Sequence, residues 1–138
     1  MNTILTFQNF RNYFISLVVF LFIDMIWLIF ISRSLYSKHL GYIMAPKVNF
    51  LAAFIFYMIF ILGLMVFVIN PALMKESWTS ALFLGMFFGI VTYATYDLTN
   101  LATVKDWPII ITVVDLIWGT VVSGITAFIS YTIIKLFN

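Results

Sequence analysis

Four long apolar runs separated by short polar segments constrain this chain more than any other feature. They cover approximately residues 13–31, 48–69, 78–103 and 109–136, and a helix of about 20 residues crosses the hydrocarbon core of a bilayer. Inside lipid the backbone must satisfy its own hydrogen bonds, which favours helices. Charged residues make up 9% of the sequence, against roughly a quarter in soluble domains. We therefore expect one all-α domain over residues 1–138, a transmembrane antiparallel four-helix bundle.

Prolines and aromatic residues mark the expected ends of these spans. Pro46, Asn70-Pro71 and Trp107-Pro108 lie at the breaks, where proline stops or starts a helix. The longest connection, residues 32–47, could form a short helix in the membrane interface. Four aromatic residues near the span ends are interpreted as an interfacial belt: Tyr36, Tyr42, Trp78 and Trp107.

The composition excludes several kinds of site. The absence of cysteine removes disulfides, iron–sulfur clusters and thiolate-ligated metals. The single histidine, His39, cannot supply the two axial ligands of a two-histidine haem, and no ligand-spacing motif supports a metal. The seven basic residues form no patch for nucleic acid. We expect no cofactor, no metal and no nucleic acid. The expected partners are membrane lipid, a small amphiphilic ligand, and a second copy of the chain or another membrane protein.

Three of the five acidic residues lie inside the apolar runs: Asp24, Asp97 and Asp115. Each would cost about 2.5–3.5 kcal/mol if it faced lipid at a helix centre. Counting inward from the hairpins at about 1.5 Å per residue places the three aspartates and Tyr57 at one depth. All four spans then contribute a polar group to a common layer, which we interpret as a site.

The faces of the expected helices support this layer. On the third span, polar residues recur at spacings of four and three and share one face, while Gly85 and Gly89 form a GxxxG pair that allows close helix packing. Small residues follow Asp115 on the fourth span. A D-x-I-W pattern recurs around the first and third aspartates, although chance explains it equally well. The candidate ligand or proton site comprises Asp24, Asp97, Asp115, Tyr57, Tyr93, Asn100, Trp27 and Trp118; no catalytic residue can be assigned.

Several segments also match the pattern of a known family. They are residues 95–103 (TYDLTNLAT), 107–108 (WP), 113–119 (VVDLIWG), 22–28 (FIDMIWL) and 67–73 (FVINPAL). In these segments the chain resembles domain of unknown function 2177, a family of predicted small bacterial membrane proteins, over nearly its whole length. The resemblance implies a four-span protein of the bacterial inner membrane and brings no established activity.

Three functions stay open. In the first, which we prefer, the acidic site binds or passes a small amphiphile, lipid, proton or cation. A transport version of it predicts a homo-oligomer, with the small-residue faces as contacts. In the second, the chain is a membrane enzyme that acts on a lipid or isoprenoid by carboxylic acid general acid/base chemistry. In the third, it is a structural or accessory subunit of a membrane complex, and the acids only fix the register of the helices.

Overall fold

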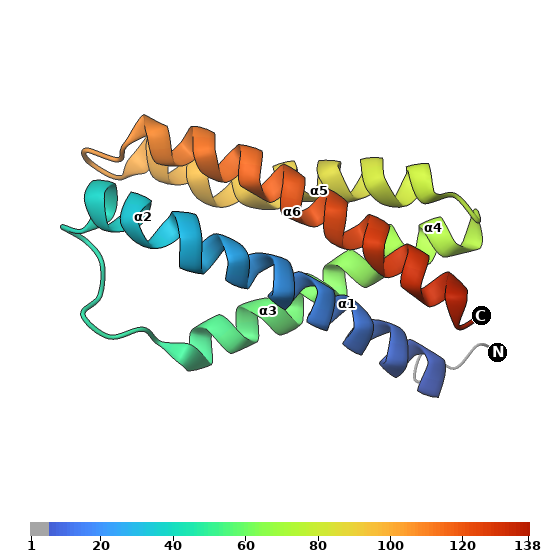
Figure 1. Cartoon of the computed structure of the whole chain (residues 1–138). Helices are drawn as coiled ribbons and strands as arrows, with labels where there is room; N and C mark the ends of the chain where they lie inside the picture. Colours follow the sequence, from blue (N-terminus) through green and yellow to red (C-terminus); the bar gives the residue numbers. More distant parts are fainter. Residues whose placement is uncertain (1–5) are drawn as a thin grey trace.

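Four long helices make up the chain in a computed structural model that describes residues 6–138. The first comprises α1 (Phe7–Trp27), the π-helical turn η1 (Leu28–Ser32) and α2 (Arg33–Leu40). The second comprises α3 (Phe50–Leu64), the π-helical turn η2 (Met65–Ile69) and α4 (Asn70–Met74). The third is α5 (Trp78–Thr103) and the fourth is α6 (Ile109–Leu136) (Figure 1). Residues 1–5 of the expected domain lie outside the described part.

All four helices are long and apolar enough to cross a membrane. No strand occurs among residues 6–138, so the predicted all-α class is confirmed. Three of the helices begin at a side-chain cap: Thr6 accepts from the Asn9 amide, Asn49 from the Ala52 amide, and Ser77 from the Ser80 amide. Such residues satisfy the free N–H groups of a first turn. The fourth helix begins directly after Pro108.

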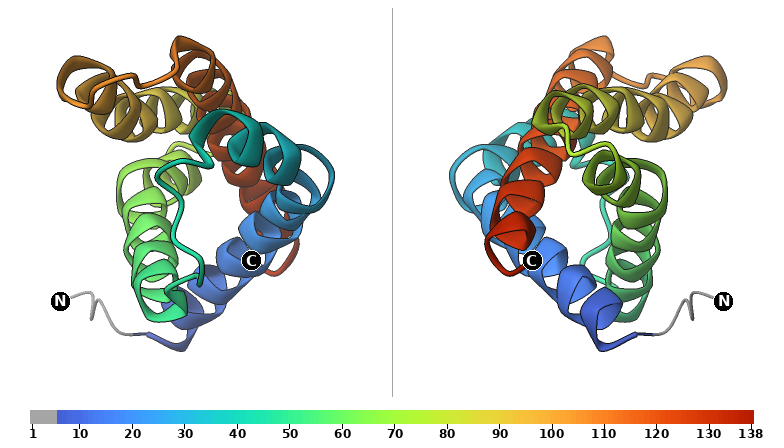
Figure 2. Two further views of the ribbon diagram at one scale, coloured as in Figure 1. Left: turned by 90° about the vertical axis from the view of Figure 1, so that its left-hand side faces the viewer. Right: turned by 90° about the vertical axis from the view of Figure 1, so that its right-hand side faces the viewer.

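Successive helices run in opposite directions. The C-terminus and the α4–α5 turn lie at one end of the molecule, and the α2–α3 connection and the α5–α6 turn lie at the other (Figure 1). The pair α5 and α6 makes the most extensive contact, and α1 lies along α6. The α3–α4 helix closes the other side of the bundle (Figure 2).

Small residues let α5 and α6 approach closely. A Cβ atom added to Gly89 would lie 2.0 Å from the Gly119 carbonyl oxygen, and one added to Gly85 would lie 2.8 Å from the Ala127 Cβ. The GxxxG pair therefore packs inside the chain. Because these faces are buried between α5 and α6, they are not available for contact with a second copy.

The first helix is longer than the sequence suggested. Residues 33–40 were expected in the connection, as a separate interfacial helix, but they continue α1 through η1, and Gly41 follows the last residue of α2. Leu40 packs against Trp107 and Ile111. Trp107 is therefore buried, at 7% exposure, and its assignment to the interfacial belt was wrong.

Pro71 also behaves differently from the prediction, because the second helix continues through it to Met74. Proline has no N–H group and its ring clashes with the preceding turn. The π-helical turn η2 ends immediately before Asn70, whose N–H bonds to the Met65 carbonyl five residues back. This wider turn accommodates the proline without breaking the helix.

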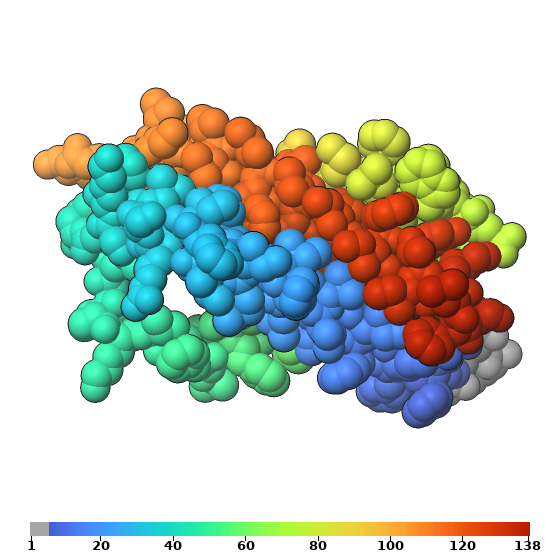
Figure 3. All heavy atoms as spheres, in the orientation of Figure 1, coloured from blue at the N-terminus to red at the C-terminus, as the bar shows by residue number. Residues whose placement is uncertain are grey.

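The apolar core lies between α1, the α3–η2 segment and α6. Its fully buried side chains include Phe20, Ile61, Leu64 and Val122. The first part of α3, by contrast, has few protein neighbours, and Phe50 and Leu51 are 79% and 69% exposed. Figure 3 shows an opening between this part of the chain and the α1–α2 helix. Such exposed apolar surface is what a bilayer would cover.

Candidate functional site

A pair of carboxyl groups lies between α5 and α6. Asp97 is completely buried and Asp115 is 5% exposed, and the two carboxyl groups lie close enough to interact. Neither oxygen of the Asp97 side chain has an N–H or O–H donor among the described residues. Two carboxyl groups in contact repel each other when both are ionised and form a hydrogen bond when they share a proton. This arrangement can therefore hold one proton between the two helices.

Asp115 has a second partner that distinguishes it from Asp97. The Tyr36 hydroxyl group donates a hydrogen bond to Asp115 Oδ1, and the Trp27 side chain lies beside the same hydroxyl. A hydroxyl donor stabilises an ionised carboxylate. In a pair with one proton, the negative charge therefore rests best on Asp115 and the proton on Asp97, which would then donate to Asp115.

Asp24 occupies a separate position on α1. Tyr57 on α3 donates a hydrogen bond to Asp24 Oδ2 at 2.7 Å, and Asp24 is 7% exposed. The Trp118 indole nitrogen, which is buried, approaches the same carboxyl group without reaching good hydrogen-bond geometry. Asp24 thus joins α1 to α3 and lies near α6.

Tyr93 lies between these acidic groups. Its side chain is within electrostatic reach of Asp24, Asp97 and Asp115, and its ring lies directly over Gly119, where an added Cβ would be 2.3 Å from it. Only glycine leaves room for the ring at this point on α6. Tyr93 therefore lies near all three predicted aspartates, and their common depth in a membrane stays a prediction.

The other predicted site residues have different surroundings. Trp27 and Trp118 stack, with ring centroids 4.4 Å apart. Asn100 lies on the predicted stripe of α5, but its side chain lies near Tyr96, and no hydrogen bond joins it to an aspartate among residues 6–138. The structure thus places the two tryptophans beside the acids and leaves Asn100 about one helical turn away.

Tyr36 is the residue that sequence reasoning missed, because it was assigned to the interfacial belt. Tyr36 lies twelve residues after Asp24. In a regular helix of about 100° per residue, the Tyr36 side chain would therefore point about 120° away from the Asp24 side chain. A π-helical turn accommodates one extra residue, which reduces this difference to about 20°. The turn η1 therefore brings Tyr36 to Asp115, and the helical periodicity of the sequence did not indicate it.

A further set of hydrogen bonds fixes the α5–α6 hairpin beside the pair. The Trp107 indole donates to Thr112 Oγ1 at 3.0 Å, and the Thr112 hydroxyl donates to the Asp97 carbonyl oxygen at 3.3 Å. These bonds involve the backbone of Asp97 and leave its carboxyl group to Asp115. They hold the two helices in one register at the depth of the pair.

Two cavities identified in the described part of the chain lie away from the acids. One, of about 390 Å³, lies between α1 and the α3–η2–α4 helix, and the other lies between the start of α5 and the end of α6. Neither is lined by an aspartate. Within residues 6–138 no three side chains of the metal-ligating kinds come together. The three aspartates themselves are buried among other side chains.

Comparisons with known proteins place the chain in a family. A family model described as "Predicted membrane protein (DUF2177)" matches residues 9–132. No curated protein and no solved structure matches the chain. Because the family match covers most of the sequence and confirms the resemblance inferred from the YDLTNLAT and D-x-I-W segments, the chain belongs to the DUF2177 family of predicted membrane proteins.

Proposed function

We propose that this chain is a proton-binding protein of the bacterial inner membrane. Its binding site is the Asp97–Asp115 carboxyl pair. The observation that carries this proposal is the closeness of two buried carboxyl groups, one of which has no hydrogen-bond donor among residues 6–138. A proton satisfies both groups at once, and its loss would leave two adjacent negative charges in a low-dielectric layer.

Tyr36 supplies a route to the pair from the outside. Its side chain is partly exposed and lies on α2, near the α5–α6 turn. A proton that arrives at the Tyr36 hydroxyl can pass to Asp115 and then to Asp97 along consecutive hydrogen-bonding groups. Passage across the bilayer, the stronger form of this function, requires a second route from Asp97 towards the opposite face.

The structural alternative has its own support in Asp24. This carboxyl group accepts a bond from Tyr57 on a neighbouring helix at 2.7 Å, which is what an acid that fixes helix register would do. The enzyme alternative needs space for a lipid beside the acids, and the two cavities described above lie elsewhere. Proton binding by the α5–α6 pair therefore has more support than catalysis.

Infrared difference spectroscopy on the purified protein tests the proposal. The parent should show the C=O stretching band of a protonated carboxylic acid near neutral pH, and Asp97→Asn should remove it while preserving the shape of the side chain. Asp106→Asn is the matched control, because Asp106 lies in the exposed α5–α6 turn. A parent without the band, or an Asp97→Asn band equal to that of the parent, would overturn the proposal.

Vesicles that contain the reconstituted protein and enclose a pH-sensitive dye distinguish proton binding from proton passage. Proton flux that is present in the parent and in Asp106→Asn but absent in Asp97→Asn would establish passage through the pair. An infrared band without flux would limit the function to proton binding.

A further inference from the structure

We propose that the groove between α1 and the α3–η2–α4 helix binds one acyl chain of an anionic membrane phospholipid. The groove is separate from the carboxyl pair. It has a volume of about 390 Å³, and seven of its nine lining residues are apolar or aromatic side chains. They are Phe10, Tyr13, Met58, Ile59, Leu62, Met65 and Val66.

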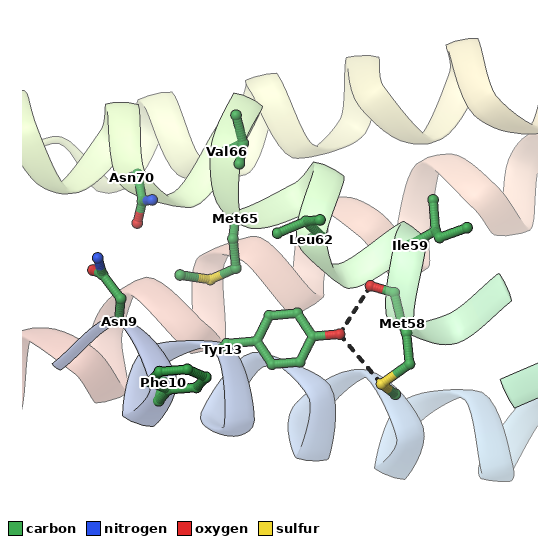
Figure 4. A pocket seen from close by; sticks show the side chains of 9 residues that line it. All are labelled: Asn9, Phe10, Tyr13, Met58, Ile59, Leu62, Met65, Val66 and Asn70. Carbon is green, nitrogen blue, oxygen red and sulfur yellow. Dashed lines mark hydrogen bonds between the residues drawn. The ribbon is translucent and has the colours of Figure 1, made fainter. Parts of the chain in front are cut away.

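The polar residues of the groove are confined to one end. Asn9 and Asn70 lie there, whereas Met58 and Ile59 lie at the opposite end (Figure 4). The Tyr13 ring lies between them, and its hydroxyl group donates to the Met58 carbonyl oxygen at 2.8 Å. Because this donor is already engaged inside the protein, the inner end of the groove presents an apolar wall. A ligand that fits must be polar at one end and apolar along the rest.

The length of the groove matches one leaflet of a bilayer. From Asn70 to Ile59 the helix advances eleven residues, or roughly 16 Å at 1.5 Å per residue. Half of the hydrocarbon core is about 15 Å. Asn70 lies near the end of the second helix at Met74, so the amide end of the groove is at the membrane surface and the apolar end is near the midplane. An acyl chain of a lipid in this leaflet has that position and direction.

The chemistry at the outer end favours an anionic headgroup. The Asn70 side chain makes no hydrogen bond to another residue of the described part, and its amide can both donate and accept. Lys75 follows one residue after α4 and is exposed, and no ion pair joins it to a residue in the range 6–138. A basic side chain at the membrane surface attracts anionic lipid. Lys75 does not line the groove, but it follows α4 at the same end of the second helix as Asn70, where the ester and phosphate groups of a phospholipid would lie.

The π-helical turn explains why the groove is present at this place. Met65 and Val66, which line it, belong to η2, and Asn70 follows directly after η2. The wider turn that Pro71 requires changes the direction of the side chains on either side of it. The same proline that the sequence presented as a helix end thus helps to shape the outer half of the groove.

Photo-crosslinking with a lipid tests this proposal. A phosphatidylglycerol that carries a diazirine on one acyl chain is incorporated with the full-length protein in nanodiscs, and the labelled residues are mapped by mass spectrometry. We expect labels to concentrate on Leu62, Val66 and Phe10. Labels spread evenly over the lipid-facing residues of all four helices would overturn the proposal.

Two variants address the acyl chain and the headgroup. Leu62→Trp fills the groove and should reduce crosslinking to Val66 several-fold, whereas Leu51→Trp, on the exposed start of α3, should leave it unchanged. Lys75→Gln should reduce the preference for phosphatidylglycerol over phosphatidylcholine by about fivefold, the effect of one basic residue near a surface. Equal labelling of the parent by both lipids would refute the anionic headgroup.

Native mass spectrometry distinguishes a lipid from a second copy of the chain in the groove. A monomer that retains one phospholipid and loses it in Leu62→Trp supports the proposal. A dimer that Leu62→Trp converts to a monomer, without a change in bound lipid, would show that protein occupies the groove instead.

Discussion

Trp27 and Trp118 stack face to face, with ring centroids 4.4 Å apart and planes 7° from parallel. The stack joins the two D-x-I-W segments across the antiparallel helices α1 and α6. Trp118 also approaches Asp24 on α1, and Trp27 lies beside Tyr36 of its own long helix, the donor to Asp115 on α6. The repeated pattern, which chance explained equally well in the sequence, therefore has a physical role in joining two helices.

A double-mutant cycle measures this stack. Trp27→Leu and Trp118→Leu should each destabilise the protein, and their combined effect should be smaller than the sum by about 0.5–1.5 kcal/mol, the coupling of an aromatic pair. The free energy of unfolding of each variant is measured in mixed micelles. Trp78→Leu combined with Trp118→Leu is the control and should be additive, because Trp78 packs against Phe128. Additivity in the first cycle would show that the stack contributes nothing specific.

Substitution by alanine should destabilise the protein strongly at Gly89 and only slightly at Gly63. In Gly89→Ala the new methyl group would lie 2.0 Å from the Gly119 carbonyl oxygen, whereas in Gly63→Ala it would lie 3.0 Å from the end of the Phe88 ring. Backbone cannot move as a ring can, so Gly89→Ala should cost more than the roughly 1–3 kcal/mol of ordinary overpacking. Gly63→Ala should change stability by less than about 1 kcal/mol. Thermal unfolding in detergent checks both, and similar melting temperatures would contradict the close α5–α6 packing.

The bounds of two helices and the helix faces that carry the aspartates could be predicted because both follow from regular helical periodicity. Two spans, α5 and α6, have the predicted bounds, since cap and proline residues lie at their ends. Asp97 shares a four-residue spacing with Gly89 and Tyr93, which places all three on one buried face. Helix rise alone then predicts a similar depth for the acidic residues.

The features that could not be predicted follow from the two π-helical turns. Each adds a residue to a turn and changes the phase of everything after it, and no single residue marks η1 in the sequence. Tyr36 was therefore expected in the connection and in the interfacial belt, whereas it lies on α2 and bonds to Asp115. Pro71 did signal η2, but a proline in an apolar run is equally compatible with a helix end. The lipid groove depends on this second turn and was missed for the same reason.

The ion pair of Lys135 and Glu76 gives a pH dependence outside the membrane layer. Lys135 donates a hydrogen bond to Glu76 at 2.8 Å, and this bond together with the ammonium charge lowers the pKa of Glu76 below its ordinary value. The pair therefore stabilises the fold above the pKa of an unfolded glutamate, about 4.3, and this contribution disappears as the pH falls through the lower folded pKa.

Glu76→Gln should remove this acid-side dependence. The melting temperatures of the parent and the variant should differ slightly at pH 6 and converge towards pH 3. Because both side chains are exposed, high salt should abolish the difference at pH 6. A difference that grows as the pH falls would contradict the assigned sign.

Deleting one residue from η1 tests whether this turn sets the position of Tyr36. Phe30 is 77% exposed, and its deletion should convert the π-helical turn to a regular one while keeping Tyr36 at Asp115, because the turn holds one extra residue. Inserting an alanine after Phe30 should instead rotate α2 by about 100° and separate the side chains of Tyr36 and Asp115.

A double-mutant cycle of Tyr36→Phe and Asp115→Asn measures the coupling between these two side chains. The coupling should be about 0.6–2 kcal/mol in the parent and in the deletion variant, and absent in the insertion variant. Coupling that survives the insertion would mean that α2 finds Asp115 independently of the π-helical turn.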